Sequence, residues 1–140
     1  MKLTHLNPPG LPDWSTLFSQ VVIAEDPRVR IAMISGQVGV DDRQLVVGDG
    51  GFAAQVQGAF ANLRVALSAA HCSLTDVAKL TIYIVRFEQE KVGVIHAVLR
   101  QHFGDGALPA CTLVGVQALA RPEFQIEVDA IAITAPGGVP

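Results

Sequence analysis

Apolar residues recur at every third or fourth position in a long stretch near the middle of the chain. The apolar positions there are Phe52, Val56, Phe60, Leu63 and Leu67. This spacing is that of one face of an α-helix. We expect the helix to begin at about Phe52, directly after the glycine-rich "GDGG" at 48–51, and to end near residues 70–72.

A second stretch with the same period predicts a helix over residues 88–103. Its apolar stripe consists of Val92, Ile95, Leu99 and Phe103. Acidic residues occupy the first turn and basic residues the last turn, an arrangement that suits the helix dipole. The sequence "GDG" at 104–106 is expected to end this helix.

Alternation with a period of two predicts the strands. The clearest case is "VAKLTIYIVR" at 77–86, in which Leu80, Ile82 and Ile84 point to one side and Lys79, Thr81 and Tyr83 to the other. The last strand alternates in the same way, with Glu127 between apolar neighbours. The remaining predicted strands are 18–24, 29–35, 110–116, 124–133 and a short one in "QLVV" at 44–47.

Two helices and five or six strands predict a two-layer α/β sandwich, with a mixed sheet and both helices on one face. We expect one domain over residues 1–140, in which the proline-rich first 14 residues form an irregular arm. Several strands are apolar on both sides, and no helix remains to cover the second face of the sheet. That pattern favours assembly into an oligomer.

Composition narrows the classes of function. The net charge is −3 with no run of basic residues, so a nucleic-acid surface is not expected. The N-terminus has charge and prolines where a signal peptide has an apolar run, and no stretch is long enough to span a bilayer. The two cysteines, Cys72 and Cys111, form neither a disulfide framework nor a metal set. We therefore expect a cytoplasmic protein with free thiols and no membrane partner.

Two residues are candidates for chemistry. Glu127 is either part of a solvated strand face or a general acid/base that positions a water molecule. Cys111 is either a small core residue or a nucleophile, and the second role needs a nearby cation or helix N-terminus to lower its thiol pKa. The four histidines are scattered and lack the spacing of metal ligands, so no metal site is predicted.

Several segments together resemble one protein family. These are "VRIAMISGQVGVD", "VQGAFANLRVAL", "VAKLTIYIV", "LPACTLVGV" and "FQIEVDAIAI". They are similar to the corresponding segments of the Rid (YjgF-like) proteins, and the resemblance extends from about Phe18 to Ile133.

The resemblance implies a chorismate-mutase-like fold that assembles as a homotrimer with a cleft at each subunit boundary. Rid proteins of this type hydrolyse imines and enamines to a keto acid and ammonia, without a metal or organic cofactor. By correspondence, Glu127 is the glutamate that positions the attacking water. Substrate-binding positions are also implied, and they are Phe18, Ser35, Gly36, Ala110 and Thr112.

The chain departs from the family pattern at two functional positions, Cys111 and Phe18. The motif "PARS" reads Pro-Ala-Cys-Thr at 109–112, so Cys111 replaces the arginine that binds the substrate carboxylate. Phe18 stands where a tyrosine is common, so a hydroxyl is lost. We expect either a hydrolase or deaminase with an altered small-molecule substrate, in which Cys111 lines the cleft or acts as a nucleophile, or a non-catalytic trimer that binds a small metabolite. Ribonuclease activity, which some family names suggest, fits the net charge of −3 poorly.

Overall fold

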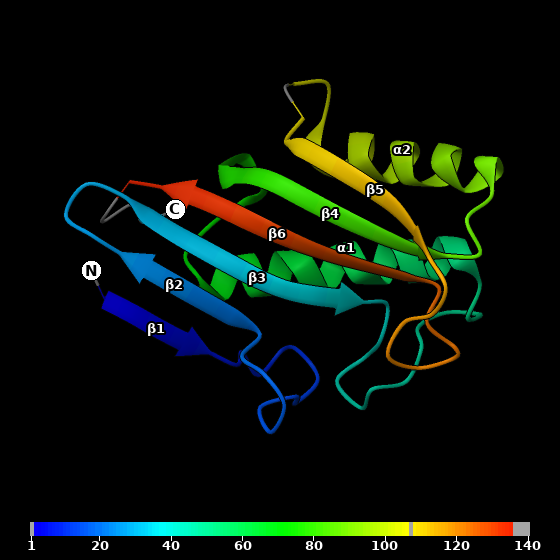
Figure 1. Ribbon diagram of the computed structural model, residues 1–140, viewed down its shortest axis with the longest axis horizontal. Helices are drawn as coiled ribbons and strands as arrows, with labels where there is room; N and C mark the ends of the chain where they lie inside the picture. Colours follow the sequence, from blue (N-terminus) through cyan, green and yellow to red (C-terminus); the bar gives the residue numbers. More distant parts are fainter. Residues whose placement is uncertain (1, 107, 136–140) are drawn as a thin grey trace.

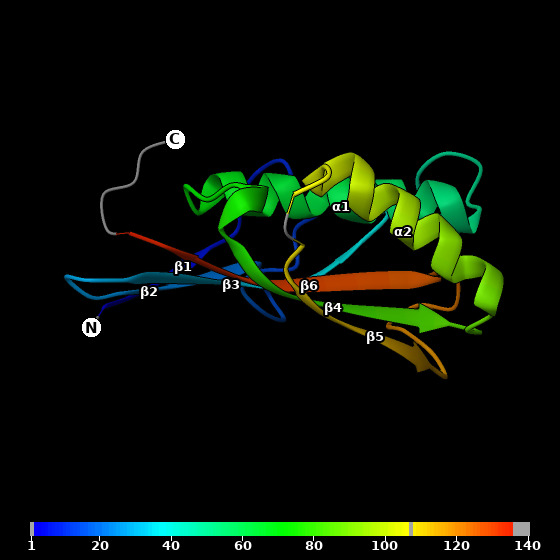
Figure 2. The ribbon, with the colours of Figure 1, turned by 90° about the horizontal axis from the view of Figure 1, so that it is seen from above.

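The computed structural model describes residues 2–106 and 108–135, and it has two layers (Figures 1 and 2). One layer is a six-stranded sheet in the order β1-β2-β3-β6-β4-β5, and the other consists of two helices that lie on the same face of the sheet. The elements in chain order are β1 (Lys2–Leu6), β2 (Val21–Glu25), β3 (Arg30–Val38), α1 (Phe52–Ala69), the short 3-10 helix η1 (Leu74–Asp76), β4 (Val77–Val85), α2 (Gln89–Phe103), β5 (Ala110–Val116) and β6 (Ile126–Thr134). The predicted fold class is confirmed.

The sheet is mixed because α2 makes a crossover between two parallel strands. β4 and β5 pair in parallel, whereas the other neighbouring strands pair antiparallel. β6, the last strand in the chain, lies between β3 and β4 in the middle of the sheet (Figure 1). Any residue on the face of β6 away from the helices therefore has a strand on each side of it.

The hydrophobic core lies between the sheet and the helices. The stripe predicted for α1 is buried from Val56 to Leu67, and it packs against Leu80, Ile82 and Ile84 of β4. The predicted bounds of both helices are confirmed to within a few residues at each end. Burial of this apolar surface is the main favourable contribution to folding.

We call the face of the sheet that carries no helix the open face. Lys79, Thr81 and Tyr83 of β4 lie on it, as the alternation predicts, and each is only partly buried. Large apolar side chains also lie exposed there, namely Met33 of β3 and Ile131 and Ile133 of β6. No helix among the described residues is long and apolar enough to cross a membrane.

Two local predictions were wrong. The first 14 residues are not irregular throughout, because β1 occupies Lys2–Leu6 and pairs with β2 along its whole length. Cross-strand hydrogen bonds to β2 form this edge strand, and its own sequence alternates only weakly. The short strand predicted at 44–47 contributes only an isolated bridge between Val40 and Val46.

The end of β3 is fixed to α1 at close range. Asn62 of α1 donates hydrogen bonds from Nδ2 to the carbonyl oxygens of Val38 and Val40, both at 2.9 Å. A Cβ atom at Gly39 would lie 2.5 Å from the carbonyl oxygen of Gln55, so only glycine allows this approach of backbone to backbone. These contacts fix where β3 ends. They therefore also fix the position of the segment between Ile34 and Gln37, where the register of β3 with β6 shifts.

Candidate functional site

A β-bulge in β3 creates a space for one carboxylate. The register between β3 and β6 is regular up to Ile34, shifts between Ile34 and Gln37, and then continues with Val38 opposite Glu127. A Cβ atom built on Gly36 would lie 1.7 Å from Oε1 of Glu127. The Glu127 carboxylate therefore occupies the space that a side chain at position 36 would need. Bulges often re-aim side chains next to functional sites.

Glu127 lies in a depression on the open face, with a volume of about 470 Å³. The depression is lined by residues from β3, β6 and the loop before β2. These residues are Phe18, Met33, Ile34, Ser35, Gly36, Glu127, Asp129, Ala130 and Ile131. The structure therefore brings together four predicted site residues, Phe18, Ser35, Gly36 and Glu127.

The loop that carries Phe18 is held against β3 by three hydrogen bonds. The Ser35 hydroxyl donates to the carbonyl oxygen of Ser19 at 2.7 Å, and the Ser35 backbone N–H donates to that of Gln20 at 2.9 Å. The buried Gln37 amide donates to Oε1 of Gln20 at 2.7 Å. Because this region of backbone is fixed on both sides, the wall of the depression is preorganised.

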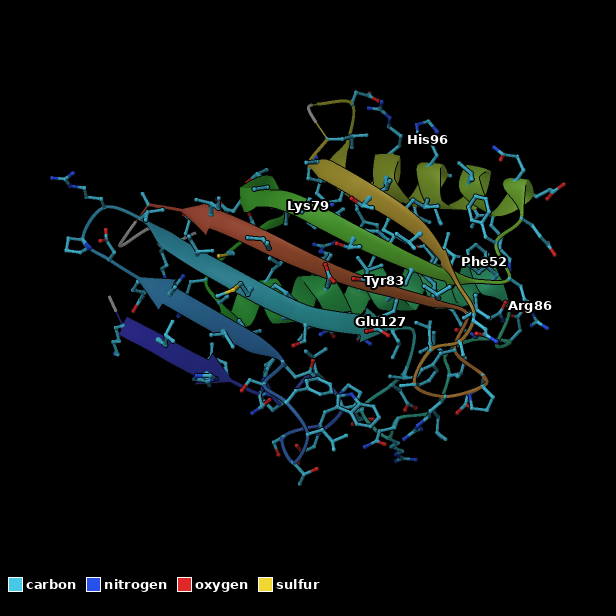
Figure 3. The ribbon with its side chains drawn as sticks, in the orientation of Figure 1. Phe52, Lys79, Tyr83, Arg86, His96 and Glu127 are labelled. Carbon is cyan, nitrogen blue, oxygen red and sulfur yellow. The ribbon has the colours of Figure 1, made fainter. Side chains whose placement is uncertain are left out.

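Two further polar residues, Tyr83 and Asp129, belong to the same site and were not predicted as site residues. Tyr83 lies directly opposite Glu127 on β4, and Figure 3 shows the two side by side on the open face. The Tyr83 hydroxyl donates a hydrogen bond to Oδ2 of Asp129 at 3.1 Å. Asp129 is two residues from Glu127 on the same strand, so both carboxylates point to the same face. The alternation of the last strand could have indicated Asp129, because it lies two residues from Glu127. Tyr83 could not be found in this way, because its place beside Glu127 depends on the pairing of β4 with β6.

The electrostatics of the site make Glu127 hold a proton more readily than a solvated glutamate does. Burial, and then the negative charge of Asp129, raise the pKa of Glu127 above its ordinary value. Burial, followed by the hydrogen bond to Asp129, also raises the pKa of Tyr83. A carboxyl group with a raised pKa can exchange a proton with a bound substrate or water near neutral pH.

Cys111 lies on the other face of the sheet. It pairs in register with Leu80, which is buried in the core under the helices, so the Cys111 side chain points to the helix side. Burial raises its thiol pKa, and the nearby Lys79 charge only partly opposes that effect. The requirement for a nucleophilic Cys111, a lowered pKa, is not met, and the structure does not bring this thiol to Glu127 within one chain.

The predicted site residues Ala110 and Thr112 flank Cys111 on the edge strand and lie on the open face. They pair with Lys79 and Thr81 of β4, so one strand lies between them and Asp129 of β6. They do not line the depression. The Lys79 ammonium donates to Oγ1 of Thr112 at 2.6 Å and to the carbonyl oxygen of Leu80 at 2.7 Å. Within one chain these residues therefore form a separate polar group.

Cys72 and Cys111 are both free thiols. Among the described residues, no group of three or more histidine, cysteine, aspartate or glutamate side chains is arranged to hold a metal ion. Acid–base chemistry by carboxyl groups is the chemistry that the depression itself can supply.

Comparisons with known proteins point to one family. A family model described as Endoribonuclease L-PSP matches residues 12–134. The chain is 32% identical over 119 residues to the 2-iminobutanoate/2-iminopropanoate deaminase of Rattus norvegicus. The aligned region covers 85% of this chain and 81% of the rat protein.

Solved structures agree with the sequence comparisons. A putative endoribonuclease from Thermotoga maritima superposes with a TM-score of 0.81 at 27% identity, covering 96% of this chain and 98% of that one. RidA from an Antarctic Psychrobacter species superposes with a TM-score of 0.78 at 25% identity, covering 92% and 98%.

Proposed function

The chain belongs to the Rid (YjgF-like) family, whose model is described as Endoribonuclease L-PSP, and from this membership we propose that it hydrolyses a small imine or enamine to a carbonyl compound and ammonia. The rat relative is named as a deaminase of 2-iminobutanoate and 2-iminopropanoate. The reaction that we propose for this chain is of the same type, with Glu127 as the acid–base group and without a metal or organic cofactor.

Hydrolysis of an imine needs one group that first accepts a proton and then returns it. In its ionised form, Glu127 removes a proton from a water molecule as the water oxygen bonds to the imine carbon. The resulting carbinolamine receives that proton on its nitrogen, and the C–N bond then breaks. Ammonia leaves as the C=O bond forms, and the proton of the carbinolamine hydroxyl passes to the Glu127 carboxylate, from which it is released to solvent. An enamine first takes up a proton on carbon and becomes the iminium ion, which water then attacks in the same way. A carboxyl group with a raised pKa suits both steps.

The observation that carries this proposal is the space at Gly36. The Glu127 carboxylate fills the position where any Cβ atom at residue 36 would lie, and it does so inside a depression of about 470 Å³. A glutamate placed there only to be solvated would not need a glycine and a β-bulge opposite it. The hydrogen bonds of Ser35 support the same view, because they fix the backbone that lines the depression.

We further propose that three copies assemble through their open faces. Met33, Ile131 and Ile133 are 42%, 40% and 46% exposed on that face, which is more apolar surface than one chain needs to leave in water. In such a homotrimer the depression of one copy lies near a boundary with the next. Ala110, Cys111 and Thr112, which lie on an edge strand, are then available to complete a neighbour's cleft.

Cys111 takes no covalent part in this proposal, and its importance lies in the arginine that it replaces. The family arginine at this position binds a carboxylate through charge-assisted hydrogen bonds, which a thiol cannot replace. We therefore expect the substrate to differ from those of the arginine-bearing relatives. Both thiols are free, which suits a reducing compartment such as the cytoplasm.

Release of ammonia from imines generated in the assay tests the proposed function. Flavin-dependent oxidases produce a panel of imines from the corresponding amines and amino acids, and trapping with semicarbazide reports how long each imine survives. We expect the protein to shorten the lifetime of at least one imine, and Glu127→Gln to lower kcat/KM by roughly 100-fold or more. Chelation of metals leaves the rate unchanged.

The alternative is a trimer that binds a small metabolite without converting it. It gains support if ligands bind to the wild type and to Glu127→Gln equally well and no imine of the panel is consumed. The endoribonuclease name of the family model favours neither outcome. The net charge of −3 and the acidic depression suit a polyanionic RNA chain poorly.

A further inference from the structure

We propose that the substrate is an imine without a carboxylate group, bound as its iminium cation between Glu127 and Asp129. This inference rests on the proposed function, and it names the substrate class of the same site. The relatives named above act on 2-imino acids, which carry a carboxylate. The charges around the depression of this chain favour a substrate of the opposite charge.

The lining of the depression is acidic and has no basic residue. Its two ionisable side chains are Glu127 and Asp129, and its other residues are apolar or, in Ser35, neutral and already engaged with the backbone. A carboxylate placed there meets like charge at short range, whereas a planar iminium meets one acceptor on each side. Like-charge contacts of this kind exclude wrong partners strongly.

Asp129 is held in place by a contact from the neighbouring strand. The Tyr83 hydroxyl of β4 donates a hydrogen bond to Oδ2 of Asp129. The charge of Asp129 then acts on Glu127, where it favours a proton at the next carboxyl group. An iminium ion bound between the two carboxyl groups offsets the charge of Asp129 in place of that proton. Glu127 is then ionised and can take the proton from water.

The cations of the open face are directed elsewhere. Lys79 lies four residues before Tyr83 on β4, and Figure 3 shows it well away from Glu127 along that strand. Its ammonium group is bonded to Thr112 and to the carbonyl oxygen of Leu80. Arg121 stacks over Trp14 and Phe124 and donates to Gln44, so it also does not line the depression.

The edge strand adds no cation in the position where the family has one. The residue there is Cys111, whose thiol pKa is raised, so it is neutral near pH 7. A neighbouring copy that contributed this segment to the cleft would therefore add a neutral group. The lining of the depression and the substitution at position 111 are independent observations, and both argue against a bound carboxylate.

Two imines that differ only in charge test the proposal. 2-Iminobutanoate and butan-2-imine have the same carbon skeleton except that a methyl group replaces the carboxylate, and flavin-dependent oxidases generate both in the assay. We expect kcat/KM to be at least about tenfold higher for butan-2-imine than for 2-iminobutanoate. Repulsion between the substrate carboxylate and one charged side chain at a partly solvated site is enough to cause a tenfold difference. A preference for 2-iminobutanoate overturns the proposal.

Substitutions at residue 129 separate charge from structure. Asp129→Asn is expected to lower kcat/KM for butan-2-imine by about tenfold and to reduce the preference between the two imines, whereas Asp129→Glu retains both. Asp105→Asn removes the same charge from an exposed loop outside the depression and is expected to change neither value. A preference that is unchanged in Asp129→Asn also overturns the proposal.

Binding of stable mimics decides the matter if neither imine is hydrolysed, in which case the proposed function fails by itself. Acetamidinium and acetate have the same size and shape but opposite charge, and titration calorimetry measures their affinity for the wild type. We expect acetamidinium to bind more tightly than acetate, with an affinity reduced about tenfold in Asp129→Asn. Equal binding of the two ions, or tighter binding of acetate, contradicts the inference independently of activity.

Discussion

The two faces of β6 show how one strand serves two purposes. Towards the helices it presents Ile126, Val128, Ala130 and Ala132, which are all buried in the core. Towards the open face it presents Glu127 and Asp129, followed by Ile131 and Ile133, which are exposed. The helix side is closed by the chain itself. The open face has a polar half, which holds the depression and whose edge Met33 and Ile131 also line, and an apolar half around Ile133, which is left for another surface.

On β6, the residues that stabilise the fold and the residues available for chemistry therefore lie on opposite faces of the same strand. Residues on the helix side have many packing neighbours, and loss of any of them leaves a cavity. Residues of the open face have few such neighbours in one chain, and their substitution acts on the site or on assembly. Substitution of the same type of residue on each face therefore tests this division directly.

Two phenylalanines provide the comparison with the largest expected effect on stability. Phe60 is fully buried in α1 and stacks on the His102 ring at 5.5 Å, whereas Phe18 is 43% exposed at the depression. Phe60→Ala is expected to lower the free energy of unfolding by about 3–5 kcal/mol, and Phe18→Ala by less than about 1 kcal/mol. Urea denaturation measures both values. Equal losses would show that the open face is as much a part of the core as the helix side.

A charge in the apolar half of the open face is expected to break the assembly. Ile133→Lys, at a residue that does not line the depression, places an ammonium group in the proposed interface, at a cost of about 2–3 kcal/mol per interface. Sedimentation should give about three times 14.8 kDa for the wild type and a value near 14.8 kDa for the variant.

The matched control for this charge is Ala97→Lys on the exposed side of α2, which should leave the assembly intact. A wild-type protein that sediments as a monomer removes the proposed trimer. It also removes any role for Cys111 in a neighbour's cleft.

The raised pKa of Glu127 predicts how stability depends on pH. Because the folded pKa lies above the unfolded value, protonation of this group favours the fold below an unfolded pKa of about 4.3, and the contribution is lost as the pH rises through the folded pKa. Glu127→Gln does not titrate, so its stability relative to the wild type should increase from pH 4 to pH 8, by less than about 1 kcal/mol after solvent screening. Urea denaturation at a series of pH values measures the difference, and a difference that falls with pH contradicts the assignment.

The smallest effect is expected for the thiol on the helix side. Cys111→Ser should change kcat/KM by less than about twofold, because the thiol is neutral near pH 7 and does not face Glu127 within its own chain. Iodoacetamide should alkylate Cys111 no faster than a small free thiol. Loss of activity in Cys111→Ser, together with rapid alkylation, would restore the nucleophilic role.

Much of the fold could be predicted from local patterns. The stripe of α1 and the alternation of β4 determine what is buried, because each has one consistent apolar face. β1 escaped prediction because its five residues are mostly exposed and gain their structure from pairing with β2. A strand that is formed by its neighbour leaves little trace in its own sequence.

The site was predictable only in part, and the reason is register. The segments "SGQ" and "IEVDA" indicated Gly36 and Glu127 through resemblance, and the structure brings them into contact. The side of the sheet to which Cys111 points depends on its pairing with Leu80, which no local pattern in β5 reveals. A shift of one residue in that parallel register would have placed the thiol on the open face.

The central claim is that the Glu127 carboxylate works from the space opposite Gly36, and two glycine variants test it most directly. Gly36→Ala forces the carboxylate out of its position, whereas Gly93→Ala, on α2, adds a methyl group where no atom lies within 4 Å. Measurement of kcat/KM for imine hydrolysis should show a loss of about 100-fold or more in Gly36→Ala and no loss in Gly93→Ala, with both variants folded. Full activity in Gly36→Ala would contradict the account.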